Sequence, residues 1–281
     1  MKCAWSALIN ILPIWLRQYV DKFGVEHLLE LRLRLGLQPE LIMSHKTLSY
    51  ERAVTVEDLQ FSVNAASQYS PWAAQTITQG YITIEGGHRI GICGNVTYKN
   101  NSVSGMNTLT SLCIRVAREF PKISKDLYMC TGSILIIGKP GSGKTTLLRD
   151  LIREKSEQGT GAVCVVDERR ELFPHYRGQF CFNTGKKTDV LSGCRKKDGI
   201  EIAIRNLGPS MIAVDEITAE EDCRALLHAG WCGVDLIATA HAGSRAELFS
   251  RVVYRPIISS NLFHTLVIMH PNKTWCIERM T

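Results

Sequence analysis

The chain carries two different patterns of apolar and polar residues. Up to about residue 128, helical periodicity and strand alternation are mixed, whereas from residue 131 onward short apolar runs alternate with helical patterns. The second pattern is typical of a parallel sheet with helices on its faces. The sequence therefore predicts an α/β protein with two domains, a smaller α+β domain at residues 1–128 and a parallel-sheet domain at residues 129–281.

The predicted elements of the first domain follow from local signals. Residues 4–35 look helical and shift to strand alternation at Glu30–Leu35. The sequence T-V-E-D, which starts at Thr55, is a capping-box pattern and predicts the start of a helix. Ser70-Pro71 predicts the start of another. Residues 81–98 predict a β-hairpin that turns at Glu85–Gly87, and residues 112–117 predict a further strand.

The second domain is predicted to alternate strands and helices. The expected strands are residues 134–137, 162–166, 210–214, 236–239, 265–269 and 275–277. The expected helices are residues 146–153, 200–207 and 219–229, and one that is capped at residues 244–247.

A glycine-rich loop lies between the strand predicted at residues 134–137 and the helix that follows it. Its sequence, GKPGSGKT, fits G-x-x-x-x-G-K-[ST], the pattern of a loop that binds the phosphates of a nucleoside triphosphate. Glycines let backbone N–H groups approach phosphate oxygens, and the positive end of the next helix favours the same anion. Lys144 would supply charge and Thr145 a hydroxyl ligand for Mg²⁺. The expected nucleotide-binding residues are Gly138, Lys139, Pro140, Gly141, Ser142, Gly143, Lys144, Thr145 and Thr146.

Two more of the apolar runs end in carboxylates. Residues 212–216 read IAVDE, a Walker B pattern in which Asp215 would hold Mg²⁺ and Glu216 follows as a second carboxylate. The sequence VVDERRE supplies Asp167, Glu168 and Glu171 at another strand end, where a carboxylate could orient the attacking water. A solvated loop is the alternative interpretation of this second group.

His241 follows the apolar run at residues 236–239. A single histidine is more often a core or surface residue than a functional one. Because this one lies at the end of a predicted strand, where ligands of parallel sheets bind, we expect it to sense the γ-phosphate.

These motifs together resemble the secretion-ATPase family, the hexameric engines of type II and type IV secretion and pilus systems. The order is GKPGSGKT, the acidic box DERRE, VDEI and the histidine box ATAHA. The resemblance implies a RecA-like P-loop NTPase core, with ATP and Mg²⁺ as cofactors. It places the catalytic glutamate of the acidic box at Glu171, and the Walker B glutamate, box histidine and preceding-helix arginine at Glu216, His241 and Arg205.

The chain departs from that pattern at two positions. Arg169 stands where the acidic box usually has proline, and Asp215 stands where Walker B usually has glycine. The division of labour between Glu171 and Glu216 is therefore left open.

A second resemblance covers nearly the whole chain. ELRLRLGLQP, GYITIEGGHRIGICG, VVDERRE and IRNLGPSMIAVDEITAEED are similar to the stage III sporulation protein AA family of endospore-forming bacteria. That resemblance implies an ATPase that powers a channel between mother cell and forespore. It also implies membrane proteins as partners and a cytoplasmic location, peripheral at the inner membrane that faces the mother cell.

Arginines in the first domain are further candidates. Secretion ATPases bring arginines of their N-terminal domain to the γ-phosphate, and Arg89 and Arg115 lie here in predicted strands among apolar neighbours. In a ring they could act on the nucleotide of the same subunit or across an interface. The alternative is that both arginines lie on the solvent face of a half-buried sheet.

Charge and composition weigh on the possible partners. The net charge is +6, but it is spread evenly over the two halves without a long basic run. Proteins of photosynthetic organisms that the chain resembles often extend beyond the ATPase core with a nucleic-acid-binding module, and we do not expect such a module here, because the sequence stops at Thr281, soon after its last predicted strand. No apolar stretch approaches the roughly 20 residues that span a bilayer. We expect no nucleic acid as partner and no transmembrane segment. A nucleic-acid-dependent P-loop motor and a nucleotide-binding structural subunit with little turnover remain the alternative functions.

Overall fold

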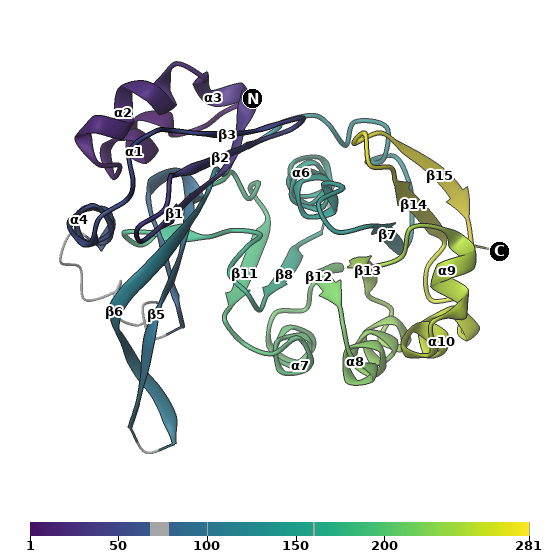
Figure 1. Cartoon of the computed structure of the whole chain (residues 1–281). Helices are drawn as coiled ribbons and strands as arrows, with labels where there is room; N and C mark the ends of the chain where they lie inside the picture. The colour runs from purple at the N-terminus through teal and green to yellow at the C-terminus, as the bar shows by residue number, and fades with distance from the viewer. Residues whose placement is uncertain (68–78, 100, 160, 281) are drawn as a thin grey trace. The chain divides into compact units, whose positions relative to one another are not determined.

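The computed structural model describes residues 1–67, 79–99, 101–159 and 161–280 (Figure 1). The chain divides into two compact units. The first contains Met1–Glu119 and Pro174–Phe182, and the second contains Phe120–Phe173 and Asn183–Thr281. The predicted helix at Ser70-Pro71 lies outside the described residues.

The first unit is a six-stranded antiparallel sheet with short helices. The strand order is β3-β2-β1-β6-β5-β4. Its elements in this sheet and beside it are α1 (Trp5–Asn10), α2 (Ile14–Asp21), α3 (Gly24–His27), β1 (Leu28–Arg34), β2 (Glu40–Met43), β3 (Thr47–Ser49), α4 (Val56–Ser67), β4 (Tyr81–Thr83), η1 (Glu85–Gly87), β5 (Arg89–Lys99) and β6 (Ser102–Arg115). The segment at residues 174–182 adds a small hairpin of β9 (His175–Tyr176) and β10 (Gln179–Phe180).

Local signals of the first unit are confirmed in three places. The Thr55 amide donates to Asp58 Oδ2 over 3.0 Å, and the Asp58 amide donates to Thr55 Oγ1 over 3.3 Å, which closes the capping box of α4. The predicted hairpin is β4 paired with β5. The strand alternation that begins at Glu30 belongs to β1, which pairs with β6.

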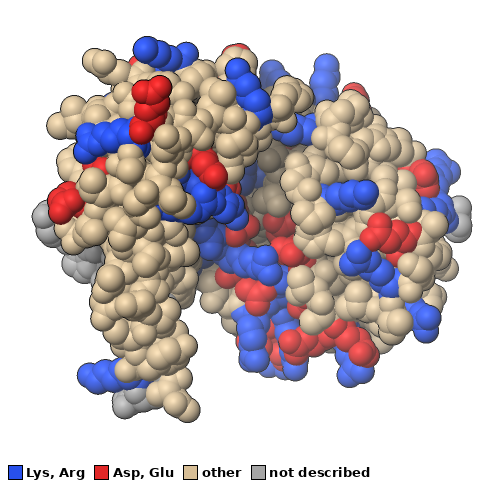
Figure 2. Space-filling view, in the orientation of Figure 1, with Lys and Arg blue, Asp and Glu red and all other residues tan. Residues whose placement is uncertain are grey.

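One strand pair of the first unit is longer than predicted. β5 and β6 pair from Arg89 and Arg115 as far as Lys99 and Ser102. The second strand of the predicted hairpin and the strand predicted at residues 112–117 are therefore the two strands of one long ribbon. In Figure 2 the end of this ribbon is nearly free of charged side chains, apart from basic atoms close to its tip.

The second unit is built on a seven-stranded sheet with the order β11-β8-β12-β13-β7-β14-β15. All neighbouring strands are parallel except β14 and β15. The elements are β7 (Ile134–Gly138), α6 (Lys144–Gln158), β8 (Val163–Asp167), β11 (Thr188–Ser192), α7 (Lys196–Asn206), β12 (Met211–Ile217), α8 (Glu220–Trp231), β13 (Asp235–Ala240), α9 (Arg245–Ser250), η2 (Val252–Tyr254), α10 (Arg255–Ser259), β14 (Thr265–Met269) and β15 (Trp275–Arg279).

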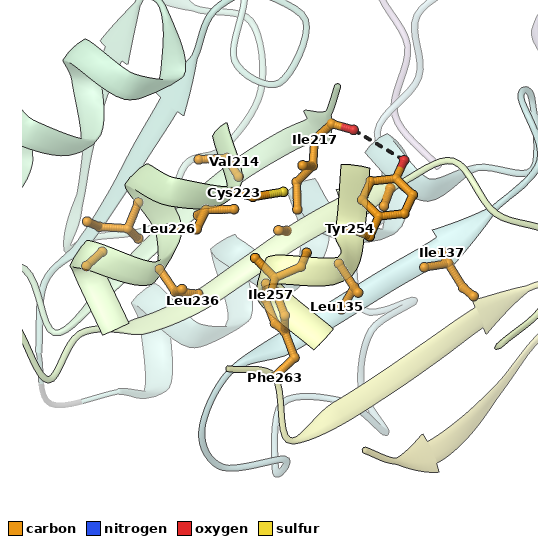
Figure 3. Close-up of a cluster of buried hydrophobic side chains, with 14 of the residues drawn as sticks. Leu135, Ile137, Val214, Ile217, Cys223, Leu226, Leu236, Tyr254, Ile257 and Phe263 are labelled. Carbon is orange, nitrogen blue, oxygen red and sulfur yellow. Dashed lines mark hydrogen bonds between the residues drawn. The ribbon is translucent and has the colours of Figure 1, made fainter. Parts of the chain in front are cut away.

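Alternating side chains of the central strands build the core of this unit. The side chains on one face of the sheet point toward α7, α8 and α10 and pack against apolar side chains of those helices (Figure 3). Members of this cluster include Leu135, Ile137, Val166, Ile212, Val214, Leu226, Leu236, Ile257 and Phe263. Helix α6 covers the opposite face of the sheet (Figure 1). With both faces covered, the strands are buried and read as continuous apolar runs, which is why the sequence predicts them.

The boundary between the units lies nine residues before the predicted end at residue 128. The reason is a buried carboxylate of α6, Asp150, which accepts hydrogen bonds from the amides of Lys122 (3.0 Å) and Ser124 (2.8 Å). These bonds attach the segment after Phe120 to the second unit. A side chain of one helix that binds a distant loop leaves no local signal in the sequence.

Candidate nucleotide-binding site

The glycine-rich loop connects the last residue of β7 to the first turn of α6. Gly141 and Gly143 have φ angles of 76° and 98°, in the left-handed region that glycine adopts without strain. At Gly138 a Cβ atom would lie 2.5 Å from Ser142 Oγ and 2.8 Å from Met269 Cβ, so no larger residue fits. The loop therefore holds the close-packed backbone that its sequence pattern predicts, at the N-terminal end of a fifteen-residue helix.

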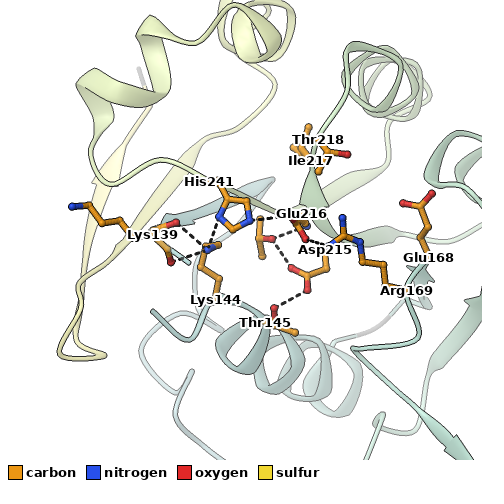
Figure 4. A network of polar contacts seen from close by, with 12 residues as sticks. Lys139, Lys144, Thr145, Glu168, Arg169, Asp215, Glu216, Ile217, Thr218 and His241 are labelled. Carbon is orange, nitrogen blue, oxygen red and sulfur yellow. Dashed lines mark hydrogen bonds and ion pairs between the residues drawn. The ribbon is translucent and has the colours of Figure 1, made fainter. Parts of the chain in front are cut away.

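Lys144 lies at the centre of the loop and its ammonium group is enclosed. The Nζ atom donates to the carbonyls of Gly138 (2.9 Å) and Lys139 (3.1 Å), and it lies 3.3 Å from His241 Nδ1 (Figure 4). Burial lowers the pKa of Lys144 from its ordinary value, although Asp215 and Glu216 counteract part of the shift. A cation held among carbonyl dipoles and carboxylates at the start of a helix is well placed to receive an anion.

Thr145 and Asp215 meet at the ends of two elements that are far apart in sequence. Thr145 Oγ1 donates to Asp215 Oδ2 over 2.7 Å, and Thr239 Oγ1 donates to Asp215 Oδ1 over 2.5 Å (Figure 4). Hydroxyl and carboxylate oxygens are ligands that Mg²⁺ accepts in proteins, usually together with waters and phosphate oxygens. No group of three or more His, Cys, Asp or Glu side chains in the described ranges could hold a metal ion by itself. This pair therefore suits a divalent cation that a phosphate helps to bind.

Glu216 follows Asp215 and has an unusual backbone. Its φ is 57°, and the pairing of β12 with β13 shifts register between Val214 and Ile217. The Glu216 amide donates to Thr239 Oγ1 over 2.7 Å. A non-glycine residue in the left-handed region is uncommon and is found preferentially at functional sites.

His241 connects Glu216 to the glycine-rich loop. Its Nε2 lies 2.9 Å from Glu216 Oε1, and its Nδ1 faces the Lys144 ammonium group. Both contacts are satisfied by a neutral imidazole that carries its proton on Nε2. The backbone amide of His241 donates to the Tyr254 hydroxyl over 3.2 Å, which fixes the end of β13.

The acidic box folds around Asp167, the last residue of β8. The buried Asp167 carboxylate accepts hydrogen bonds from the amides of Glu171 and Phe173, both of 2.9 Å. Burial raises the pKa of Asp167, and these amides oppose the shift. The Arg149 guanidinium donates to the Glu171 carbonyl over 2.8 Å. The backbone of Glu171 is thus held firmly, while the carboxylate that contacts His241 is that of Glu216.

Two polar contacts beside the site were not predicted. Arg169 Nη1 lies 2.7 Å from Glu216 Oε2. Lys196, which begins α7 and is 4% exposed, forms an ion pair with Glu168 and lies 3.8 Å from Asp222 Oδ2. The departure from proline at Arg169 was a signal for the first contact, whereas nothing in the sequence around Lys196 distinguishes it from a surface lysine.

Arg205 is not brought to this group of residues. It lies in the last turn of α7, only a few residues before β12 begins, and therefore near the end of the sheet opposite to the glycine-rich loop. Its side chain is 72% exposed and pairs with Glu201 over 2.5 Å. Within its own subunit Arg205 cannot reach the nucleotide that the loop would hold.

Arg89 and Arg115 belong to the first unit. They are direct cross-strand partners on β5 and β6, so they share one face of that sheet. The Arg89 guanidinium lies 4.0 Å from the centre of the Tyr81 ring, and Arg115 Nε lies 3.5 Å from Glu30 Oε2. A role at a nucleotide remains a prediction for both.

The described helices include none that is long and apolar enough to cross a membrane.

Comparison with known proteins gives the family and the fold. The model of the family described as "Sporulation stage III, protein AA" matches residues 6–277. Stage III sporulation protein AA of Bacillus subtilis (strain 168) is 35% identical over 259 residues, 88% of this chain and 84% of the relative.

Two solved structures share the architecture. The ATPase DotB of Legionella pneumophila is 18% identical, with a TM-score of 0.63 over 95% of this chain and 80% of DotB. The pilus retraction motor PilT, solved with bound ADP, is 15% identical, with a TM-score of 0.59 over 89% of this chain and 76% of PilT. The predicted RecA-like core is thus confirmed, and the chain belongs to the stage III sporulation protein AA family, with the fold of secretion ATPases.

Proposed function

We propose that the chain is a Mg²⁺-dependent ATPase that works as a homo-oligomeric ring, a hexamer by the resemblance to secretion ATPases. The observation that carries this proposal is the contact of Thr145 with Asp215 beside the enclosed Lys144 ammonium. It joins a hydroxyl, a carboxylate and a cation at the N-terminal end of α6, the three groups that a nucleotide with its divalent cation needs.

The residues present fit a nucleotide and Mg²⁺. Ser142 Oγ is buried and has no hydrogen-bond partner among the residues that the structure describes, so the loop has a donor to spare for a phosphate oxygen. The proposed phosphate contacts are the loop at residues 138–143, Lys144, Thr145 and Thr146. The Mg²⁺ would be held by Thr145 and by Asp215, and it would neutralise charge on the phosphates.

Two carboxylates compete for the role of orienting or deprotonating the attacking water. Glu216 has the better-defined surroundings, because its carboxylate contacts His241 and lies close to Lys144. Glu171 matches the catalytic glutamate of the acidic box in the secretion-ATPase resemblance. We propose that one of these two carboxylates orients or deprotonates the attacking water. We also propose that His241 senses the γ-phosphate through its contact with Lys144.

Arginines from the same chain or a neighbouring copy would complete the site in a ring. Arg89 and Arg115 are the candidates from the first unit, where they share one sheet face. Arg205 could act only across a subunit interface. A guanidinium on the transferred phosphoryl group offsets the negative charge that develops there.

We further propose that ATP hydrolysis drives a secretion-like assembly between mother cell and forespore. The chain would sit at the inner membrane on the mother-cell side and contact membrane proteins of the assembly. The name of the B. subtilis relative supports the sporulation role. Charge supports a protein partner over nucleic acid, because acidic and basic side chains are paired on the exposed faces of α7 and α8, as in Glu201 with Arg205 and Glu220 with Arg224, and Figure 2 shows both signs of charge mixed there.

One comparison of ATP turnover tests this function. The purified chain would be assayed alone, with linear double-stranded DNA, and with inner-membrane vesicles from sporulating and from vegetative cells. We expect Mg²⁺-dependent turnover that rises with vesicles from sporulating cells only. Stimulation by DNA instead would favour a nucleic-acid motor, and binding of ATP without turnover under every condition would favour a structural subunit.

A further inference from the structure

We propose that Arg169 is a positioning residue for the Walker B glutamate, Glu216. The proposal rests on the ATPase function proposed above. Arg169 lies in the loop after β8, whereas Glu216 lies at the end of β12, the neighbouring strand in the sheet. The ion pair between them therefore connects the acidic box directly to Walker B.

The first step of the argument is that the Glu216 carboxylate is contacted at both oxygens. His241 Nε2 lies 2.9 Å from Oε1, and Arg169 Nη1 lies 2.7 Å from Oε2 (Figure 4). The Arg169 guanidinium thus contacts one carboxylate oxygen of Glu216, and the other oxygen contacts His241, whose ring also faces Lys144. Charge-assisted hydrogen bonds of this length favour one orientation of the carboxylate over its rotated alternatives.

The second step concerns the backbone below that carboxylate. Glu216 has a φ of 57°, and it lies where the β12–β13 pairing is irregular, so the sheet itself restrains it less than its neighbours. Its amide is held by Thr239 Oγ1. Side-chain contacts must then supply the rest of the restraint on where the carboxylate lies, and Arg169 supplies part of it.

The third step is that Arg169 itself comes from an anchored loop. Its predecessor Glu168 is paired with the buried Lys196, and Asp167 binds the amides of Glu171 and Phe173. A guanidinium on a loop fixed on both sides can hold a second group in place, whereas the same side chain on a loose loop could not.

The ion pair is suited to catalysis rather than to fold stability. The Arg169 side chain is 55% exposed and that of Glu216 is 26% exposed, and pairs this open to water contribute little to folding. Substitution of Arg169 should therefore leave the chain folded. A misplaced carboxylate, in contrast, slows the chemical step while nucleotide affinity is retained.

The test is a double-mutant cycle on the steady-state rate of ATP turnover. The rate is measured as release of radiolabelled phosphate, which is sensitive enough for slow variants. The variants are Arg169→Gln, Arg169→Lys, Glu216→Gln and the double variant Arg169→Gln/Glu216→Gln. Arg224→Gln is the matched control, because Arg224 also pairs with a glutamate over 2.7 Å on an exposed surface of the same unit.

We expect Arg169→Gln to lower kcat roughly 10-fold with KM nearly unchanged, and Arg169→Lys to restore part of the loss. In the Glu216→Gln background the same change should cost nothing further, because the group that it positions is gone. A parental kcat in Arg169→Gln, or an equal loss in both backgrounds, would overturn the inference. Parental turnover that survives Lys144→Ala would instead remove the proposed function, and this inference with it.

Discussion

Thr145 Oγ1 and Asp215 Oδ2 lie 2.7 Å apart although 70 residues separate them in the chain. The contact joins the first turn of α6 to the end of β12, and the other Asp215 oxygen is held by Thr239. Asp215 is therefore oriented before any ligand arrives. A ligand set that is prepared in this way binds a cation with little rearrangement of its own.

That relationship predicts how Thr145 variants respond to Mg²⁺. Thr145→Val removes the hydroxyl and should lower ATP turnover by roughly 100-fold while it raises the Mg²⁺ concentration needed for half-maximal rate. Thr145→Ser keeps the hydroxyl and should stay close to the parent. Mg²⁺ titrations of the three proteins measure both effects. A valine variant with the parental Mg²⁺ response would remove Thr145 from the metal site.

The two glutamates can be separated by matched amide substitutions. If Glu171 orients or deprotonates the water, Glu171→Gln should lower turnover by about 100-fold or more while ATP stays bound, since such a role is commonly worth ~10² to 10⁴ in rate. Glu216→Gln is the comparison. Filter binding and turnover would be measured on both. Loss confined to Glu216→Gln would assign the catalytic carboxylate to Walker B and show that the acidic-box assignment is wrong.

Arginines of the first unit are tested by mixing subunits. If Arg115 acts across an interface, an inactive Arg115→Ala protein mixed with an inactive Lys144→Ala protein should regain part of the turnover, because some interfaces then pair an intact loop with an intact arginine. Arg89→Ala is tested in the same way. Should each arginine variant alone hydrolyse ATP at the parental rate in an assembled ring, both residues are surface residues of the sheet.

Acid should destabilise the first unit through one buried histidine. His88 is fully buried, its Nε2 lies 3.0 Å from the Ala4 carbonyl, and its Nδ1 accepts from the Ala117 amide over 3.0 Å. Burial lowers the pKa of His88 from 6.5 to about 4. Between pH 6.5 and pH 4 this histidine is therefore protonated in the unfolded chain but not in the folded chain. The free energy of unfolding should fall by about 3 kcal/mol as the pH is lowered across that window.

Urea unfolding followed by the intrinsic tryptophan fluorescence of the chain, to which Trp5 and Trp15 of the first unit contribute, would measure this loss. Above pH 6.5 the His88 contribution is complete, and below pH 4 no further loss should come from this group. His88→Gln should be less stable at pH 7 but should lack this part of the pH dependence, whereas His45→Gln, at an exposed position of the same unit, should keep it. Identical pH profiles for the parent and His88→Gln would contradict the assignment.

Most of the second unit could be predicted because its strands are buried on both faces. Each such strand contains a short apolar run, and some of these runs lead into a glycine or a carboxylate, as at Gly138, Asp167 and Asp215. β11 was missed because Thr188–Ser192 is an edge strand with polar residues and carries no such run. The hairpin at residues 175–180 was missed because its two strands are two residues long.

The candidate site was predictable as a set of residues but not as a set of contacts. The motifs gave Lys144, Asp215 and His241 because each follows a strand or opens a helix. The contact of Arg169 with Glu216 and the left-handed backbone of Glu216 depend on how two neighbouring strand ends pack, which no local pattern encodes. Arg205 was expected near the nucleotide from the resemblance alone, and the direction of α7 places it at the far end of the sheet.

The central claim, that this chain hydrolyses ATP at the loop before α6, is tested most directly by Lys144→Ala. The purified parent, Lys144→Ala and the exposed-lysine control Lys186→Ala would be compared for Mg²⁺-dependent phosphate release and for melting temperature. Because the Lys144 ammonium is buried and its pKa is lowered, its removal should not reduce the melting temperature markedly. We predict turnover at least roughly 100-fold below the parent in a folded Lys144→Ala protein and parental turnover in Lys186→Ala. Parental turnover in folded Lys144→Ala would contradict the account.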